Sequence, residues 1–399
     1  MYKPDRFILQ KYADLLVNFA LNSGRGVKPG EVVQVLVPDV AKPFYGALQR
    51  SILQAKAMPL MRLLATGFER DYFNLANQEQ LKFFPKAYLK ARVKLLDHTI
   101  SILADKDLKA LRRVPPAKIM THAEAQKPYR IWLFDKEYEG KFTWTVALYG
   151  TPAMAKEANL SLTDYWQEII RACYLDDEQP VKQWQRLETE IKRLTRRLNQ
   201  LEIETIKITG EGVNLTISLG QQRRFIGGGG RNIPSYEIFT SPDWRGTEGE
   251  ISFNQPLYRY GNLIQGITLY FHQGKVVKAT AKQGQNLLRE MLKRPNANKI
   301  GEFSLTDKRF SRIRHFMANT LFDENIGGSQ GNSHIALGMS YKDAFAGNPK
   351  QLGTKLAKSL GFVDSGEHCD IVSTNKRQVD VRLVKGRWLT IYADGSFLI

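Results

Sequence analysis

Residues 31–38 read EVVQVLVP, a largely apolar run that is closed by a proline. Such a run is typical of a strand buried on both faces of a parallel sheet. Residues 39–57 follow with apolar side chains at helical spacing, and residues 58–65 (MPLMRLLA) form a second strand candidate. A strand, a helix and another strand in succession predict an α/β unit with parallel strands.

Strand candidates continue outward from this unit. They are residues 95–104, residues 130–134 (RIWLF) and residues 142–150. A long helix follows, in which apolar residues from Trp184 to Leu201 recur at steps of three and four. We therefore predict an N-terminal α/β domain over residues 1–200, with a mostly parallel sheet and the long helix at its end. No glycine-rich phosphate-binding loop follows any of these strands, so nucleotide binding is not supported.

The pattern changes after residue 201. Apolar and polar residues alternate between glycine turns, and residues 263–281 contain a hairpin signal at HQGK. Alternation of this kind is typical of antiparallel strands with one solvated face. We predict a second domain over residues 201–399, of the α+β type and rich in antiparallel strands.

The bulk composition limits the classes of protein to consider. The chain has 399 residues, a formal charge of +18 and two cysteines. No run reaches the roughly 18 apolar residues of a membrane helix, and the N-terminus has no secretory signal pattern. We expect a cytoplasmic protein without a membrane partner. The Lys and Arg residues are scattered and match no nucleic-acid-binding module, so nucleic acid is not an expected partner.

Acidic and imidazole side chains in the second half form the candidate site. They are Glu237, Glu302, Glu324, His334, His368 and Asp370. On a strand, His368 and Asp370 share a face and Cys369 points the other way. Taken singly, each has a simpler reading: a solvated Glu at a strand end, a core histidine, a turn, or a His–Asp hydrogen bond. Taken together, two imidazoles and several carboxylates fit a two-metal hydrolytic site, in which ions about 3.5–4 Å apart share a carboxylate.

Four segments carry a family resemblance. In chain order they are RNIPSYEIFTSP (231–242), KIGEFSLT (299–306), LFDENIGGSQGNSHIALGMSY (321–341) and EHCDIVS (367–373). They resemble the motifs of the M29 metallo-aminopeptidases, the thermophilic aminopeptidase group. Residues 15–38 and 165–187 resemble that family's first half, so the resemblance covers most of the chain.

The resemblance implies a role for each matched residue. Glu237, His334, His368 and Asp370 would be metal ligands, and Glu302 would be a ligand that bridges two ions. Tyr341 would be catalytic, and Glu324 would act as a ligand or proton carrier, with Glu302 also able to carry the proton. The implied cofactor is a pair of divalent ions, zinc or cobalt first, with manganese and magnesium as alternatives.

The implied activity is release of N-terminal amino acids from peptides by a water that two metal ions activate. The substrates would be peptides with a free N-terminus, and the implied assembly is a homodimer. One departure is the glycine-rich segment 325–333, which is longer than the family version and is predicted to reshape the rim of the pocket.

Two alternatives stay open from the sequence. His334, His368 and Asp370 alone would form the two-histidine, one-carboxylate site of a mononuclear non-haem iron ring-cleaving dioxygenase. Such a site has no need of Glu237 and Glu302, which favours the peptidase. The second alternative is a basic binding protein with an inactive site.

Overall fold

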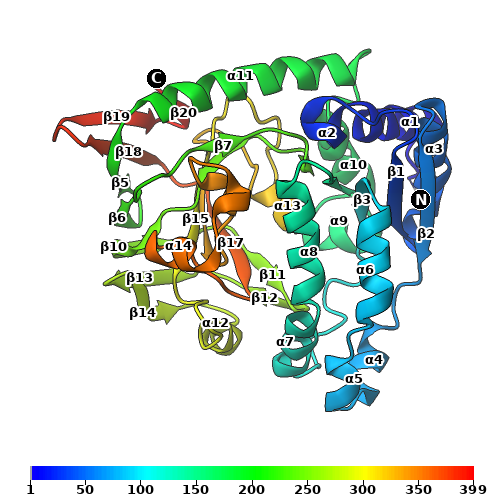
Figure 1. Ribbon diagram of the computed structural model, residues 1–399, viewed down its shortest axis with the longest axis horizontal. Helices are drawn as coiled ribbons and strands as arrows, with labels where there is room; N and C mark the ends of the chain where they lie inside the picture. Colours follow the sequence, from blue (N-terminus) through cyan, green and yellow to red (C-terminus); the bar gives the residue numbers. More distant parts are fainter. Residues whose placement is uncertain (1) are drawn as a thin grey trace.

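The computed structural model describes residues 2–399, and its first layer is a parallel sheet (Figure 1). The strand order is β2 (Met58–Leu64), β1 (Val32–Pro38), β3 (His98–Leu103), β4 (Thr143–Leu148) and β8 (Asn232–Ile233). Every neighbouring pair in this sheet is parallel. The four strands predicted at 31–38, 58–65, 95–104 and 142–150 are confirmed.

Helices cover the parallel sheet on both sides. Because β1 is flanked by β2 on one side and β3 on the other, right-handed crossovers place their helices on opposite faces. Figure 1 shows α3 on one side of these strands and α6 on the other. The helices of this half are α1 (Arg6–Leu15), α2 (Leu21–Gly24), α3 (Lys42–Gln54), α4 (Glu69–Leu75), α5 (Gln78–Lys82), α6 (Lys86–Leu95), α7 (Pro116–Ala125), α8 (Lys127–Tyr138), α9 (Pro152–Glu157) and α10 (Leu162–Ala172).

The strand predicted at residues 130–134 is wrong, because these residues lie inside α8. A proline occupies the first turn of the helix, where its missing N–H costs no hydrogen bond. Ile131, Phe134 and Tyr138 then recur at steps of three and four, which is helical spacing. The four apolar residues in succession at 131–134 cannot by themselves distinguish a strand from a buried helix turn.

The predicted long helix is confirmed as α11 (Pro180–Gln200). Its buried stripe includes Trp184, Ile191 and Leu198, and its other faces carry charged side chains. Figure 1 shows α11 running across the top of the molecule, from above α2 to the region of β20. The helix therefore packs along both halves of the chain.

Two antiparallel sheets dominate the second half, as predicted. The larger has the order β14 (Lys275–Thr280), β13 (Thr268–His272), β10 (Asp243–Ser252), β6 (Val213–Ser218), β5 (Ile203–Gly210), β18 (Arg377–Leu383), β19 (Trp388–Ala393) and β20 (Ser396–Phe397). The smaller has the order β17 (His368–Ser373), β16 (Asn332–Gly338), β15 (Ile300–Thr306), β9 (Glu237–Thr240) and β7 (Ile226–Gly227). Further elements of this half are the ribbon β11 (Leu257–Arg259) and β12 (Asn262–Ile264), and the α-helices α12 (Gln285–Leu292), α13 (Thr320–Asp323) and α14 (Thr354–Ser359).

The smaller sheet forms the most buried layer of the second half. All residues of β15 and β16 are buried. Cys369 on β17 and Cys173 after α10 are both buried and not in a disulfide. Within residues 2–399, no helix combines the length and apolarity needed to cross a membrane.

Candidate metal centre

The register of the smaller sheet brings the predicted ligands onto one face. The directly opposed pairs are Thr306 with Glu237, Ser304 with His334, Glu302 with Ala336, Ala336 with Asp370, and Gly338 with His368. Opposed residues in an antiparallel sheet share a face, and so do residues two apart on one strand. Four adjacent strands therefore present Glu237, Glu302, His334, His368 and Asp370 to the same side.

Short distances join these side chains into two groups. His334 Nε2 lies 3.1 Å from Glu302 Oε1 and 3.4 Å from Glu237 Oε2. His368 Nε2 lies 3.3 Å from Asp370 Oδ1 and 3.9 Å from Glu302 Oε2. Each group of three, Glu237–Glu302–His334 and Glu302–His368–Asp370, has candidate ligand atoms within 4.8 Å of one another. Glu302 belongs to both groups.

The site concentrates negative charge in a buried volume. Burial raises the pKa of Glu237, and the charges of Glu302 and Asp370 raise it further against the effect of His334. Burial raises the pKa of Glu324 well above its usual range, and the neighbouring carboxylates add to this effect. Four carboxylates thus face two imidazoles where an uncompensated charge costs several kcal/mol. Bound cations would remove this repulsion.

The two histidines respond to the same charge in the opposite direction. Burial lowers the pKa of His334, but its hydrogen bond with Glu302 and the nearby carboxylates outweigh burial and raise the pKa to about 8. For His368, burial is likewise outweighed by Asp370, and the pKa rises to about 9. Both shifts show that the surrounding carboxylates favour a positive charge at this position.

The donor atoms fit divalent cations. His368 Nδ1 lies 2.8 Å from the Met339 carbonyl oxygen, which can only accept a hydrogen bond. A neutral imidazole that donates through Nδ1 presents the free lone pair of Nε2 to the carboxylates, which is the form that binds metals. The set contains imidazole nitrogen and carboxylate oxygen without thiolate, a combination suited to zinc and its neighbours. Cys369 faces the opposite side of β17.

Glu324 and Tyr341 lie beside the two groups. The Asn232 side-chain amide donates to Glu324 Oε1 at 3.2 Å. The Tyr341 ring meets the His368 ring edge-on, with 4.9 Å between centroids. Burial and the charges of Glu302 and Asp370 raise the pKa of Tyr341 well above its usual range. The Tyr341 phenol therefore keeps its proton and can donate it in a hydrogen bond.

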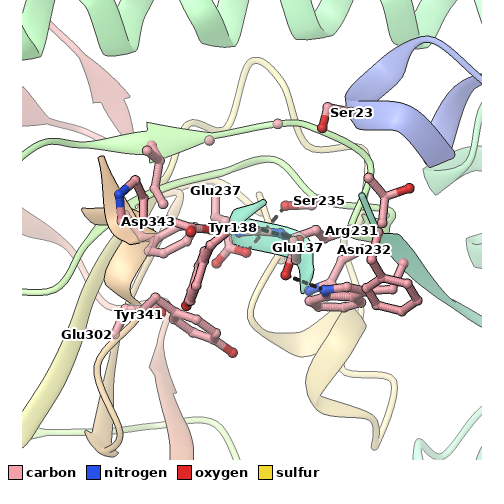
Figure 2. A pocket seen from close by; sticks show the side chains of 18 of the residues that line it. Ser23, Glu137, Tyr138, Arg231, Asn232, Ser235, Glu237, Glu302, Tyr341 and Asp343 are labelled. Carbon is pink, nitrogen blue, oxygen red and sulfur yellow. Dashed lines mark hydrogen bonds and ion pairs between the residues drawn. The ribbon is translucent and has the colours of Figure 1, made fainter. Parts of the chain in front are cut away.

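A cavity of about 460 Å³ opens onto this cluster. Six of the seven predicted site residues line it, and His334 is the exception. The first half of the chain contributes Glu137 and Tyr138 from the end of α8 and Trp144 from β4. Figure 2 shows Glu137 beside Arg231 in this wall. The cavity is thus built from both halves of the chain.

Sequence reasoning did not find Arg231, Glu137 and Asp343. The Arg231 guanidinium lies 2.9 Å from Glu137 Oε1 and also pairs with Asp343. Burial alone would lower the pKa of Arg231, but Glu137 and Asp343 outweigh burial and raise it. Arg231 directly follows four glycines, a composition typical of a turn. Arg231 is the first residue of segment 231–242, which also contains Glu237, and this is the only sequence signal that links Arg231 to the cavity.

Known proteins similar to this chain include aminopeptidases from several bacteria. Aminopeptidase PepS from Streptococcus thermophilus is 27% identical over 98% of each chain. Aminopeptidase T from Thermus aquaticus is 26% identical over 96% of this chain and 98% of its own. The solved structure of wild-type AmpT from Thermus thermophilus has a TM-score of 0.83 and 23% identity, covering 98% of this chain and 99% of that chain. This structural likeness confirms the fold.

The family is shown by a match that extends over nearly the whole chain. The family described as thermophilic metalloprotease (M29) matches residues 6–397. The predicted resemblance is therefore confirmed, and the ligand cluster lies within the matched region. The chain belongs to the M29 family of thermophilic metalloproteases, hydrolases that act on peptide bonds.

Proposed function

We propose that this protein is an aminopeptidase that uses two divalent cations. The observation that carries the proposal is that Glu302 belongs to both groups of candidate ligands, because its carboxylate lies within reach of both histidines. Glu237, Glu302 and His334 would hold one ion, and Glu302, His368 and Asp370 the other. Zinc or cobalt suits these donors best, with manganese and magnesium as alternatives.

The bound ions would lower the pKa of a water and polarise the scissile carbonyl. The chain's own residues supply the rest of the chemistry. We assign Tyr341 as the donor to the oxyanion that develops on the scissile carbonyl, because its buried phenol stays protonated. We assign proton transfer to the leaving amine to Glu324 rather than Glu302, because Glu324 lies in neither ligand group.

The similarity to known proteins favours cleavage at the N-terminal end of a peptide. The similar proteins are aminopeptidases from several bacteria, and this supports a requirement for a free amino terminus in the substrate. We also propose that the protein works as a cytoplasmic homodimer on peptides with a free N-terminus.

The iron dioxygenase and inactive-protein alternatives are less well supported. A mononuclear iron site needs only His334, His368 and Asp370, yet Glu237 lies 3.4 Å from His334 Nε2. Every matched position also carries a residue able to bind a metal. Neither alternative therefore explains why Glu237 and Glu302 lie beside His334.

The test compares two reporter amides on protein treated with a chelator. We expect leucine p-nitroanilide hydrolysis to stop after chelation and to return when zinc or cobalt is added back. N-acetyl-leucine p-nitroanilide, which lacks the free amine, should remain uncut throughout. Full activity after exhaustive chelation, or equal cleavage of the blocked amide, would contradict the proposal. Ring cleavage of a catechol with one iron per chain would favour the dioxygenase instead.

A further inference from the structure

A second cavity, of about 590 Å³, shares a wall with the candidate metal centre, because Tyr138 and Tyr341 line both cavities. Its other walls come from α8, from α14, from the start of β10 and from the segment just before β15. We call this cavity the α8–α14 groove; Figure 1 shows the two helices that flank it. Its position places it next to the proposed site of peptide cleavage.

The floor of the α8–α14 groove is apolar. Helix α8 has no fully buried side chain along its length, and Ile131 is 44% exposed. Ile131, Phe134 and Tyr138 lie on one face of α8 and line the groove. The Phe134 ring meets the Tyr341 ring edge-on, with 6.4 Å between centroids. An apolar surface therefore leads from the groove to the residue assigned as oxyanion donor.

The rim of the groove is strongly basic. Its cationic side chains are Lys127, Arg130, Arg245, Lys299, Lys342 and Lys358, against the acidic Asp135 and Asp364. Lys127 pairs with Asp364 at 3.0 Å, and Arg245 pairs with Asp243 at 2.5 Å. Within residues 2–399, no ion pair engages the other four cations, Arg130, Lys299, Lys342 and Lys358. The rim thus has positive charge available for an anionic ligand.

Lys299 is held in a setting that favours an anion. Its ammonium lies 3.8 Å from the centre of the Trp244 ring and donates to Asn296 Oδ1 at 2.9 Å. Partial burial lowers the pKa of Lys299, and the charges of Lys275 and Lys358 lower it further. A bound carboxylate would relieve this repulsion between like charges.

We propose that the α8–α14 groove holds the part of a peptide that follows the scissile bond, and that it selects peptides with acidic side chains there. The apolar floor would contact the first residue after the cleaved bond, and the free cations of the rim would contact the carboxylates beyond it. This inference rests on the proposed aminopeptidase function. It gives part of the +18 formal charge a role in substrate selection.

The test measures a ratio of kcat/KM values within each protein. The substrates are the tetrapeptide amides Leu-Phe-Glu-Glu-NH₂ and Leu-Phe-Gln-Gln-NH₂, and leucine release is followed at low ionic strength. For the unmodified protein we expect the acidic peptide to be cleaved about fivefold faster or more, as charge contacts of moderate strength would give. In the double variant Lys299→Gln/Lys358→Gln, the ratio should fall to near one.

A matched variant controls for total charge. Lys182→Gln/Arg186→Gln removes the same charge from two exposed positions on α11, so this variant should keep the preference for the acidic peptide. Equal cleavage of both peptides by the unmodified protein would overturn the inference and leave the aminopeptidase function standing. An equal loss of preference in both double variants would also overturn it. Failure to release leucine from either peptide would overturn the proposed function and this inference together.

Discussion

The two oxygens of the Glu302 carboxylate face different imidazoles. Oε1 lies 3.1 Å from His334 Nε2, and Oε2 lies 3.9 Å from His368 Nε2. Glu237 adds a second carboxylate on the His334 side, and Asp370 adds one on the His368 side. Had Glu237 and Glu302 pointed into solvent far from His334, the peptidase interpretation would have failed at this point.

Replacing Glu302 should therefore affect both proposed ions. In Glu302→Gln the charge that both ions share is lost, and we expect the metal content to fall well below two per chain. Hydrolysis of leucine p-nitroanilide should fall by at least about 100-fold, since even outer partners of metal ligands cost 10–100-fold. Glu250→Gln, at an exposed position on β10, is the matched control. Two ions per chain and full activity in Glu302→Gln would refute the shared role.

Tyr341→Phe tests the assigned oxyanion donor. Removing the phenol O–H should lower kcat by about 10²–10³-fold, the usual cost of losing one such donor. The metal content and KM should change little, because the hydroxyl is assigned to neither ligand group. Steady-state kinetics with parallel metal analysis separates the effects. A loss that appears in KM alone would instead make Tyr341 a substrate-binding residue.

At the residue scale, the sequence predicts the ligands better than the rest of the cavity. Glu237, Glu302, His334, His368 and Asp370 lie in short motifs, and the structure brings all five together. Arg231 pairs with Glu137, which is 94 residues away in sequence, and no local pattern reveals such a pair. The ligand roles themselves stay predictions.

At the scale of elements, the alternation of side chains along β17 places candidate metal ligands on one face and a core side chain on the other. Cys369 is buried on the face opposite His368 and Asp370, and burial raises the pKa of its thiol to about 12. The thiol is therefore neutral and acts as a small core side chain.

Paired variants on β17 test this separation. Cys369→Ser should lower the free energy of unfolding by about 1–3 kcal/mol, because it buries a hydroxyl without an assured partner, and should leave the metal content unchanged. Asp370→Asn should lower the metal content and have the smaller effect on unfolding of the chelated protein. Urea unfolding and metal analysis measure both effects. Metal loss in Cys369→Ser with metal retention in Asp370→Asn would contradict the assigned faces.

Glu31 joins the starts of two parallel strands, β1 and β3. Its Oε2 accepts hydrogen bonds from the Lys28 N–H at 2.6 Å and the Asn22 amide at 2.9 Å, and lies 2.8 Å from His98 Nε2. Partial burial raises the pKa of Glu31, but these hydrogen bonds outweigh burial and lower it below its usual value. The ionised carboxylate therefore stabilises the N-terminal ends of these two strands.

The sign of the resulting pH dependence follows from the lowered pKa. Above the usual Glu pKa, Glu31 makes its full contribution to the free energy of unfolding. This contribution is lost as the pH falls through the folded-state pKa, because the unfolded chain binds the proton more readily. The stability difference between the unmodified protein and Glu31→Gln should therefore shrink between about pH 6 and pH 3. Urea unfolding across this range measures it. A difference that stays constant with pH would show that the Glu31 charge contributes nothing.

The elements also show why sequence patterns succeed or fail. The long stripe of α11 has a period that fits a helix only, and the run of β1 is rich in valine and closed by a proline, which favours a strand. Residues 131–134 give only four apolar residues in succession, without a clear period, and the proline at residue 128 is what favours the helix. The apolar face of α8 lines a groove and is not packed in the core, so α8 has no buried stripe of helical spacing.

At the scale of the whole molecule, the cavity depends on both halves of the chain. Its ligands come from the smaller antiparallel sheet, while Glu137, Tyr138 and Trp144 come from the first half. Strand β8 adds residues of the second half to the parallel sheet by pairing with β4. The predicted boundary near residue 200 and the homodimer stay predictions.

The order of strands in the smaller sheet was beyond prediction from the sequence. Its ligand-bearing strands lie next to one another, yet long segments separate them in the sequence. The segment between β15 and β16 has 25 residues, and the longer one between β9 and β15 includes β10 and α12. Only a family resemblance could indicate that Glu237, which precedes Glu302 by more than sixty positions, returns to its side.

The most direct test of the central claim is a crystal structure of the metal-loaded protein with anomalous scattering recorded at the absorption edge of the metal. We predict two anomalous peaks per chain, one beside Glu237 and His334 and one beside His368 and Asp370, with Glu302 in contact with both. A single peak bound by His334, His368 and Asp370 alone, with Glu237 turned away, would contradict the account.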